Sequence, residues 1–172
     1  MAEVSRYSLW LVPEGAAAGA LQRAIDELAR QHGGPTFPPH LTLFGSLAGE
    51  EDDVVERCRR LASRLTRLTV HLDGIDVGET YFQSLFATVR PTPELLAARD
   101  AAQQLFPEVP PVPYRPHVSL VYGHPSAETK RAILQTLRGT LPPSFGARTL
   151  VVYETGAGLD DWRLALRAPF GG

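Results

Sequence analysis

Two short segments of this 172-residue chain match by residue type at five successive positions, and this duplication constrains the fold more than any other feature. Pro-His-Leu-Thr-Leu occupies residues 39–43, and Pro-His-Val-Ser-Leu occupies residues 116–120, so the two histidines are 77 positions apart. In a strand, residues i and i+2 lie on the same face, about 7 Å apart. Each segment therefore predicts a strand with an imidazole and a hydroxyl on one face and apolar side chains on the other.

The same shift of 77 residues relates the other elements that periodicity predicts. The first half is expected to contain a strand at 4–12, a helix at 16–31, a strand at 40–44 that Gly45 ends, a helix at 50–66 and a strand at 68–77. The second half is expected to contain a strand at 81–89, a helix at 93–106, a strand at 117–121, a helix at 127–138 and a strand at 146–153. The pattern predicts two lobe-forming repeats, residues 4–77 and 81–154, and a closing strand at 161–168. Two repeats are too few for a solenoid, so we expect a single bilobal α+β domain over residues 1–172.

A pseudo-twofold relation between the repeats would bring the two motif strands to one cleft. Imidazole has an ordinary pKa near ~6.5, so at neutral pH one histidine can accept a proton while the other holds one. Hydroxyl donors stabilise the charge that builds on the equatorial oxygens of a phosphate under attack. The paired motifs therefore predict phosphoester chemistry that needs no metal.

Two other chemistries fit the motifs less well. A zinc site usually has three or four ligands, and the two histidines lack convergent Cys, Asp or Glu at ligand spacing. A serine triad would place its nucleophile in a Gly-x-Ser-x-Gly turn between a strand and a helix, and neither motif hydroxyl has that context.

Charge and cysteine content limit the partners and the setting. The 17 basic and 19 acidic residues give a net charge of -2, which argues against a partner held by a broad basic surface, such as long duplex DNA.

The single cysteine, Cys58, has no internal disulfide partner, so we expect a reducing, cytoplasmic location and a buried thiol. No apolar stretch is long enough to span a membrane, and the first residues lack the features of a signal peptide. The arginines of residues 57–67 favour a solvated helix face, with a stripe for an RNA backbone as the alternative.

The chain resembles the 2H phosphoesterase superfamily, which is defined by two His-x-Thr/Ser-x motifs, and within it the cyclic phosphodiesterase branch. The likeness covers nearly the whole chain and includes the segments Tyr7-Ser8-Leu9-Trp10, 34–40, Tyr81-Phe82-Gln83 and 113–122. It implies a bilobal fold of two pseudo-twofold-related lobes, mainly antiparallel sheet with outer helices, around a central cleft. It also implies a monomer without metal or cofactor that hydrolyses ADP-ribose 1″,2″-cyclic phosphate, nucleoside 2′,3′-cyclic phosphates, or both. The products would be ADP-ribose 1″-phosphate and nucleoside 2′-phosphates.

The resemblance also implies roles for particular residues. The catalytic residues would be His40, Thr42, His117 and Ser119. We assign His117 as the base that activates water and His40 as the acid for the leaving oxygen.

Three aromatic residues are expected to bind the substrate. Tyr122 follows from its place after the second motif, and Trp10 and Phe82 are candidates to line the cleft or stack on a base. Core packing is the alternative for both Trp10 and Phe82, because large aromatic side chains are mostly buried for area alone.

Two other functions remain open at this stage. The protein could process RNA 3′ ends that carry a 2′,3′-cyclic phosphate, as the RNA-ligase-like branch with the same motifs does. It could also be a nucleotide-binding module without activity. The short chain and the net charge of -2 favour a small-molecule cyclic phosphate or nucleotide as the partner.

Overall fold

The computed structural model describes residues 6–156 and 158–172. Residues 4 and 5 of the first expected strand lie outside these ranges. The helices are α1 (Gly15–His32), α2 (Glu51–Arg64), α3 (Pro93–Leu105) and α4 (Ala127–Leu137), with a 3-10 turn at Leu159–Asp161. The strands are β1 (Arg6–Leu11), β2 (Leu41–Ala48), β3 (Leu68–Thr80), β4 (Gln83–Val89), β5 (His117–Val121), β6 (Ser144–Ala147), β7 (Thr149–Glu154) and β8 (Arg163–Pro169).

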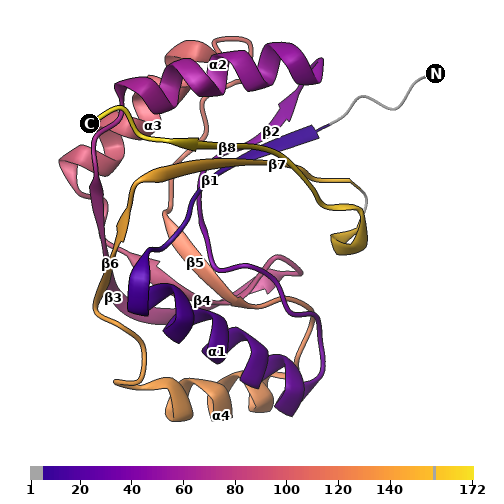
Figure 1. Cartoon of the computed structure of the whole chain (residues 1–172). Coiled ribbons are helices and arrows are strands. Elements are labelled where there is room, and N and C mark those ends of the chain that lie inside the picture. The colour runs from indigo at the N-terminus through magenta and orange to yellow at the C-terminus, as the bar shows by residue number, and fades with distance from the viewer. Residues whose placement is uncertain (1–5, 157) are drawn as a thin grey trace.

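The eight strands form one antiparallel, unclosed sheet in the order β6-β3-β4-β5-β2-β1-β7-β8. The two motif strands, β2 and β5, are neighbours at its centre and share a single register pair, Leu41 with Val118. The sheet bends at this weak seam into two halves that face each other (Figure 1). The expected bilobal α+β fold is confirmed.

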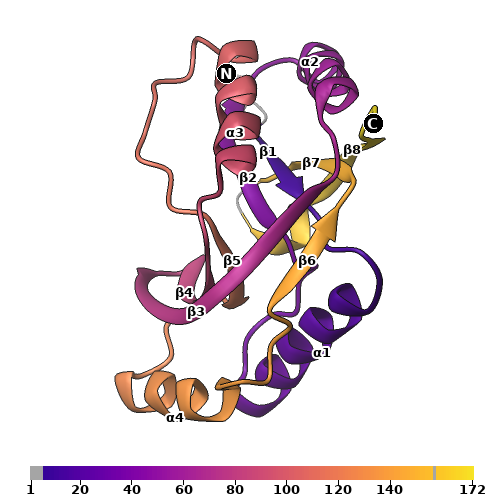
Figure 2. The same cartoon turned by 90° about the vertical axis from the view of Figure 1, so that its left-hand side faces the viewer.

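The two sequence repeats are interwoven within this sheet. The third strand of the first repeat, β3, pairs with β4 of the second repeat, whereas β7 of the second repeat pairs with β1 of the first. The helices follow the same exchange: α1 packs on β5 and β6, and α3 packs on β2. Figures 1 and 2 show α1 and α4 along one half of the sheet and α2 and α3 along the other.

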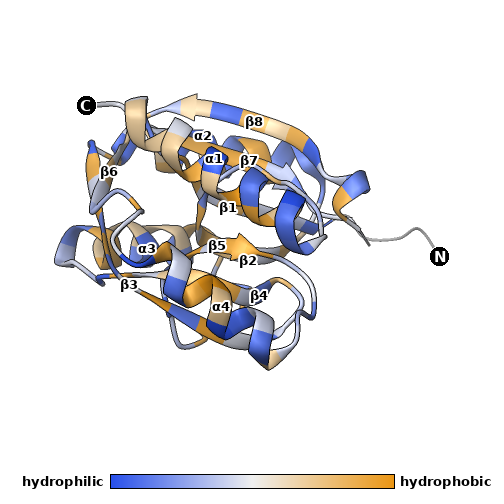
Figure 3. Ribbon diagram, turned by 90° about the horizontal axis from the view of Figure 1, so that it is seen from below, coloured by the Kyte–Doolittle hydropathy of each residue, from blue (hydrophilic) through white to orange (hydrophobic). Residues whose placement is uncertain are grey.

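Amphipathic helices cover the outer faces of the sheet, and α1 and α4 accordingly mix hydrophobic and hydrophilic residues (Figure 3). Cys58 lies on the inner face of α2 and is fully buried, as expected, and burial raises the pKa of its thiol to about 12. The apolar residues between the motif polar groups, such as Leu41 and Val118, are also fully buried. The core therefore fixes the opposite, polar face of β2 and β5 toward the inside of the bend.

Several strand ends differ from the sequence prediction by up to three residues, and two expected strands differ more substantially. Gly45 does not end β2: the chain makes a bulge there, Ser46 takes a φ of 61°, and the strand continues to Ala48, which pairs with Arg6. The strand expected at 146–153 is two strands, because β6 pairs with β3 in one half and β7 pairs with β1 and β8 in the other. Over the described residues, no helix is long and apolar enough to cross a membrane.

Candidate active site

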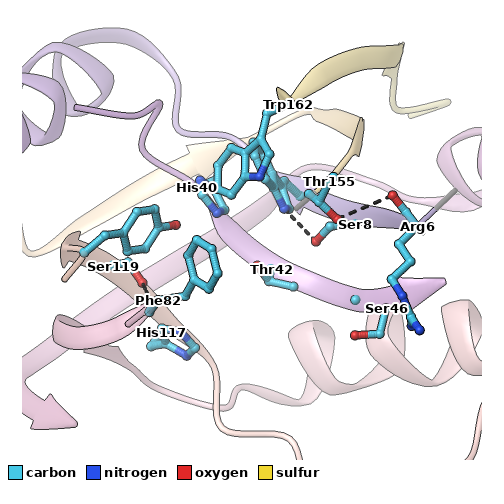
Figure 4. A pocket seen from close by; sticks show the side chains of 14 residues that line it. Arg6, Ser8, His40, Thr42, Ser46, Phe82, His117, Ser119, Thr155 and Trp162 are labelled. Atoms are coloured by element: carbon cyan, nitrogen blue, oxygen red, sulfur yellow. Dashed lines mark hydrogen bonds between the residues drawn. The ribbon is translucent and has the colours of Figure 1, made fainter. Parts of the chain in front are cut away.

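A cavity of about 400 Å³ opens on the inner face of the sheet at the β2–β5 seam. This volume lies within the usual range for small-molecule sites. All seven site residues expected from the sequence line it: Trp10, His40, Thr42, Phe82, His117, Ser119 and Tyr122 (Figure 4). The two histidines, distant in sequence, therefore face one space.

His40 stands immediately before β2 and is buried, with 6 % of its surface exposed. Its Nδ1 lies 2.7 Å from the carbonyl oxygen of Pro38, and the Trp10 ring stacks on it at a centroid distance of 3.7 Å. Burial lowers the pKa of His40 from 6.5 to about 4; the bond to Pro38 opposes this shift and the electrostatic interaction with His117 adds to it. The His40 imidazole is therefore neutral at pH 7.

His117, the first residue of β5, repeats this arrangement in the other half. Its Nδ1 lies 2.9 Å from the carbonyl oxygen of Arg115, again two residues earlier, and the Phe86 ring contacts it edge-on at 5.2 Å. A carbonyl oxygen can only accept, so these contacts make Nδ1–H the donor and leave Nε2 unprotonated in each neutral ring. For His117 this follows the shorter contact, because the Gln83 amide nitrogen lies farther from its Nδ1, at 3.4 Å. His117 is the more exposed of the two rings.

The two motif hydroxyls have different surroundings. Ser119 is buried and its Oγ donates to the carbonyl oxygen of Phe82 at 2.9 Å. No hydrogen bond of the Thr42 hydroxyl is formed within the described part of the chain, so this group is available to a ligand. Burial raises the pKa of the Tyr122 phenol well above its ordinary value, against a hydrogen bond with Ser119, and its ring stacks on Phe37 at 3.7 Å.

Aromatic rings from both halves of the sheet enclose the cavity. Trp10 is 2 % exposed, stacks between His40 and Tyr153, and donates its Nε1–H to the Ser8 hydroxyl at 2.7 Å. It therefore combines core packing with a place at the cavity. Phe82, in the β3–β4 turn, is 46 % exposed and lies nearly parallel to Trp162 of the other half at 6.1 Å. Phe82 and the partly buried Trp162 can together contact the flat face of a base.

The structure adds cavity residues that the sequence reasoning missed. These are Arg6, Ser8, Gly45, Ser46, Thr155, Gly156 and Trp162. Strand alternation could have found Arg6 and Ser8, because they share a face of β1 with Trp10. The sequence pattern places Trp162 only in the closing strand expected at 161–168, whereas the structure has it just before β8, and no local pattern connects it to the cleft.

The described lining of this cavity is electropositive. It includes the cation Arg6 and two imidazoles, and none of its residues is Asp or Glu. No cluster of three or more His, Cys, Asp or Glu side chains suited to a metal ion occurs in residues 6–156 and 158–172. The groups present are those that hold an anion and move protons.

The arginines of α2 do not extend this positive lining. Arg57 forms ion pairs with Asp53 and Glu108, and Arg67, just after the helix, pairs with Glu14. The helix itself packs on β7 and β8 from the outer side of the sheet (Figure 1), and none of its residues lines the cavity. The structure thus supports the solvated-face interpretation of this stripe.

Comparison with known proteins gives consistent matches. The family model of the 2′-5′ RNA ligase superfamily matches residues 13–159. A cyclic phosphodiesterase of Arabidopsis thaliana is 28 % identical over 133 residues, covering 76 % of this chain and 74 % of the relative. A 2′,3′-cyclic-nucleotide 3′-phosphodiesterase of Yarrowia lipolytica is 25 % identical over 169 residues, covering 76 % of each chain. Among solved structures, E. coli LigT complexed with 3′-AMP has a TM-score of 0.61 and 16 % identity, covering 99 % of this chain and 100 % of LigT.

Proposed function

The chain belongs to the 2′-5′ RNA ligase superfamily, and we propose that it hydrolyses cyclic phosphodiesters by acid–base catalysis with two histidines. One observation carries the proposal: two imidazoles, each with Nδ1 beside a carbonyl oxygen two residues earlier, line one cavity whose described lining has no carboxylate. Hydroxyls beside both rings suit the oxygens of a phosphate.

The substrate class follows from the relatives and from the cavity. The relatives in Arabidopsis and Yarrowia are named for cyclic phosphodiester substrates, and LigT was crystallised with a mononucleotide. A cavity of about 400 Å³ lined by the Phe82–Trp162 aromatic pair suits one nucleotide. We therefore propose nucleoside 2′,3′-cyclic phosphates, ADP-ribose 1″,2″-cyclic phosphate, or both as substrates.

The reaction uses His117 as the base and His40 as the acid. His117 is the more exposed ring, so water can reach it, whereas His40 lies beneath the aromatic rings that would hold the nucleoside. His117 takes a proton from water as the water oxygen bonds to phosphorus. The bond from phosphorus to the 3′ oxygen breaks, and that oxygen takes the proton of His40. A nucleoside 2′-phosphate results, and solvent exchange restores both imidazoles.

This direction requires His40 to gain a proton when the substrate binds, because burial alone leaves its imidazole neutral at pH 7. A cyclic phosphate is an anion, and a negative charge beside a buried histidine favours the protonated form. Binding of an anionic analogue should therefore take up a proton, which calorimetry in buffers of different ionisation enthalpy detects. Absence of proton uptake would favour the opposite direction, with His40 as the base.

The function is tested by phosphorus NMR of the products from a panel of cyclic phosphates. The panel contains adenosine 2′,3′-cyclic phosphate, ADP-ribose 1″,2″-cyclic phosphate and an oligonucleotide with a 2′,3′-cyclic end. We expect a 2′-phosphate from the mononucleotide, loss of turnover in His40→Ala and His117→Ala, and normal turnover in His32→Ala, which changes an exposed histidine at the end of α1. Hydrolysis of none of these compounds would refute the proposal and favour the binding module without activity.

The same panel tests the RNA-end alternative. Strong preference for the oligonucleotide over the mononucleotide would establish an RNA-processing role. We expect the mononucleotide to be at least as good a substrate, because the α2 arginines lie away from the cavity and two neighbouring carboxylates neutralise Arg57.

A further inference from the structure

The cavity has a second polar end, away from the two histidines. Arg6 and Ser46 lie there, opposite His117 and Ser119 (Figure 4). Arg6 is four residues before Trp10 on β1, and four residues of strand span about 13 Å. A cyclic phosphate held by the histidines is far shorter than this span, so it does not occupy the second end.

Arg6 contributes the cation at this end. No carboxylate of residues 6–156 or 158–172 forms an ion pair with Arg6, whereas Arg163 nearby on β8 is held by Glu51 and Glu154. The backbone of Arg6 is anchored, since its carbonyl oxygen accepts the amide of Thr155 at 2.8 Å and the Thr155 hydroxyl at 3.4 Å. The guanidinium thus extends from a fixed point, and among residues 6–156 and 158–172 no carboxylate is paired with it.

Ser46 supports this end by an unusual backbone conformation. Within the described residues it is the one non-glycine residue with positive φ, at 61°. Such a conformation is strained for most residues other than glycine and is concentrated at functional sites. The bulge that produces it places Ser46 at the cavity beside Gly45.

We infer that Arg6 and Ser46 form a second anion subsite for a phosphoryl group on the 5′ oxygen of the substrate nucleotide. The inference rests on the proposed function. With the cyclic phosphate at the histidines and the base against Phe82 and Trp162, the ribose 5′ oxygen is the part of the nucleotide left to point toward Arg6. Arg6 then sets specificity: it selects nucleotides with a second anionic group over nucleosides that carry the cyclic phosphate alone.

The test compares adenosine 2′,3′-cyclic phosphate with a free 5′ hydroxyl against the same compound with a 5′-phosphate. We expect a kcat/KM at least about tenfold higher for the 5′-phosphorylated compound, mostly through KM, since one charge-assisted contact can supply that factor. Arg6→Ala should remove the preference and Arg6→Lys should keep part of it. Arg59→Ala, which removes an exposed charge from α2, should leave the preference intact.

Two further substrates distinguish the source of the second phosphoryl group. ADP-ribose 1″,2″-cyclic phosphate carries a diphosphate, and a dinucleotide with a 2′,3′-cyclic end carries the internal diester of an RNA strand. If Arg6→Ala slows hydrolysis of the ADP-ribose compound, the second phosphoryl group belongs to a small nucleotide. If Arg6→Ala slows hydrolysis of the dinucleotide, that group belongs to an RNA end.

Binding measurements compare ligands with and without a 5′-phosphate independently of turnover. Calorimetry should show adenosine 2′,5′-bisphosphate binding about tenfold more tightly than adenosine 2′-phosphate to the wild type and about equally to Arg6→Ala. Equal binding by the wild type, or an unchanged preference in Arg6→Ala, would overturn the subsite. Failure to hydrolyse any cyclic phosphate would instead refute the proposed function, while the binding ratio still decides the subsite.

Discussion

Burial of His40 couples the stability of the protein to pH in a way that one substitution can isolate. Its imidazole binds a proton with a pKa of about 4 in the native state and 6.5 in the unfolded chain. Between these values the unfolded state holds more protons, so the free energy of unfolding falls as the pH falls. The contribution is fully present above pH 6.5, is lost progressively down to about pH 4, and stays constant below that.

The size of the effect follows from the shift. A difference of about 2.5 pKa units at ~1.36 kcal/mol each gives about 3 kcal/mol. This is a large part of the ~5–15 kcal/mol that stabilises a typical domain. Because carboxylates also titrate in this range, the informative quantity is the difference between the wild type and a variant in which residue 40 does not titrate.

His40→Gln serves as that variant, since an amide can still donate to the carbonyl oxygen of Pro38. Urea unfolding of both proteins from pH 7 to pH 4, in low-salt buffers without phosphate, should show the stability difference change by about 3 kcal/mol in favour of the variant at low pH. A difference that stays constant within about 0.5 kcal/mol across this range would refute the argument that burial keeps His40 neutral. Saturating inorganic phosphate should reduce the change, because an anion stabilises the protonated ring.

Four other predictions concern activity. The double variant His40→Ala/His117→Ala should hydrolyse a cyclic phosphate at the background rate, because each acid–base group supplies roughly 10²–10⁴-fold, and turnover above background would remove the mechanism. Dialysis against EDTA should leave the rate unchanged; a loss that added metal restores would point to a metal enzyme. The rate should depend on pH as a bell-shaped curve, and a flat profile from about pH 5 to about pH 9 would contradict acid–base roles for two imidazoles. Phe82→Ala should raise KM about tenfold with little change in kcat or thermal midpoint, since base stacking contributes ~1–3 kcal/mol. The control Leu164→Ala, which changes an equally exposed side chain, should leave KM unchanged as well.

The local features of the site could be predicted from the sequence because they repeat and alternate. The matching motifs place His40 and His117 at equivalent positions, and the helices begin and end within a few residues of the expected bounds. The periodicity of apolar residues predicts these helices and strands directly, because backbone geometry fixes the side-chain spacing of each type of element.

The remaining features depend on contacts between distant segments. The continuation of β2 past Gly45 becomes favourable only because Leu47 and Ala48 find partners on β1. The protonation state of His40 depends on the Trp10 ring that covers it and on surrounding burial, neither of which is visible in the motif itself. Trp162 reaches the cavity from a loop whose path is decided by the pairing of β7 with β8.

The pairing of β3 with β4 and of β7 with β1 has a consequence for the integrity of the molecule. Cutting the chain between residues 80 and 83 would separate β3 from β4 and β1 from β7, so each fragment would expose a bare strand edge along with apolar surface. Neither fragment would be a self-sufficient unit, and each would carry one imidazole of the pair. Association of the two fragments would restore both the sheet and the histidine pair. Recovery of turnover would therefore directly measure how well the fragments complement each other.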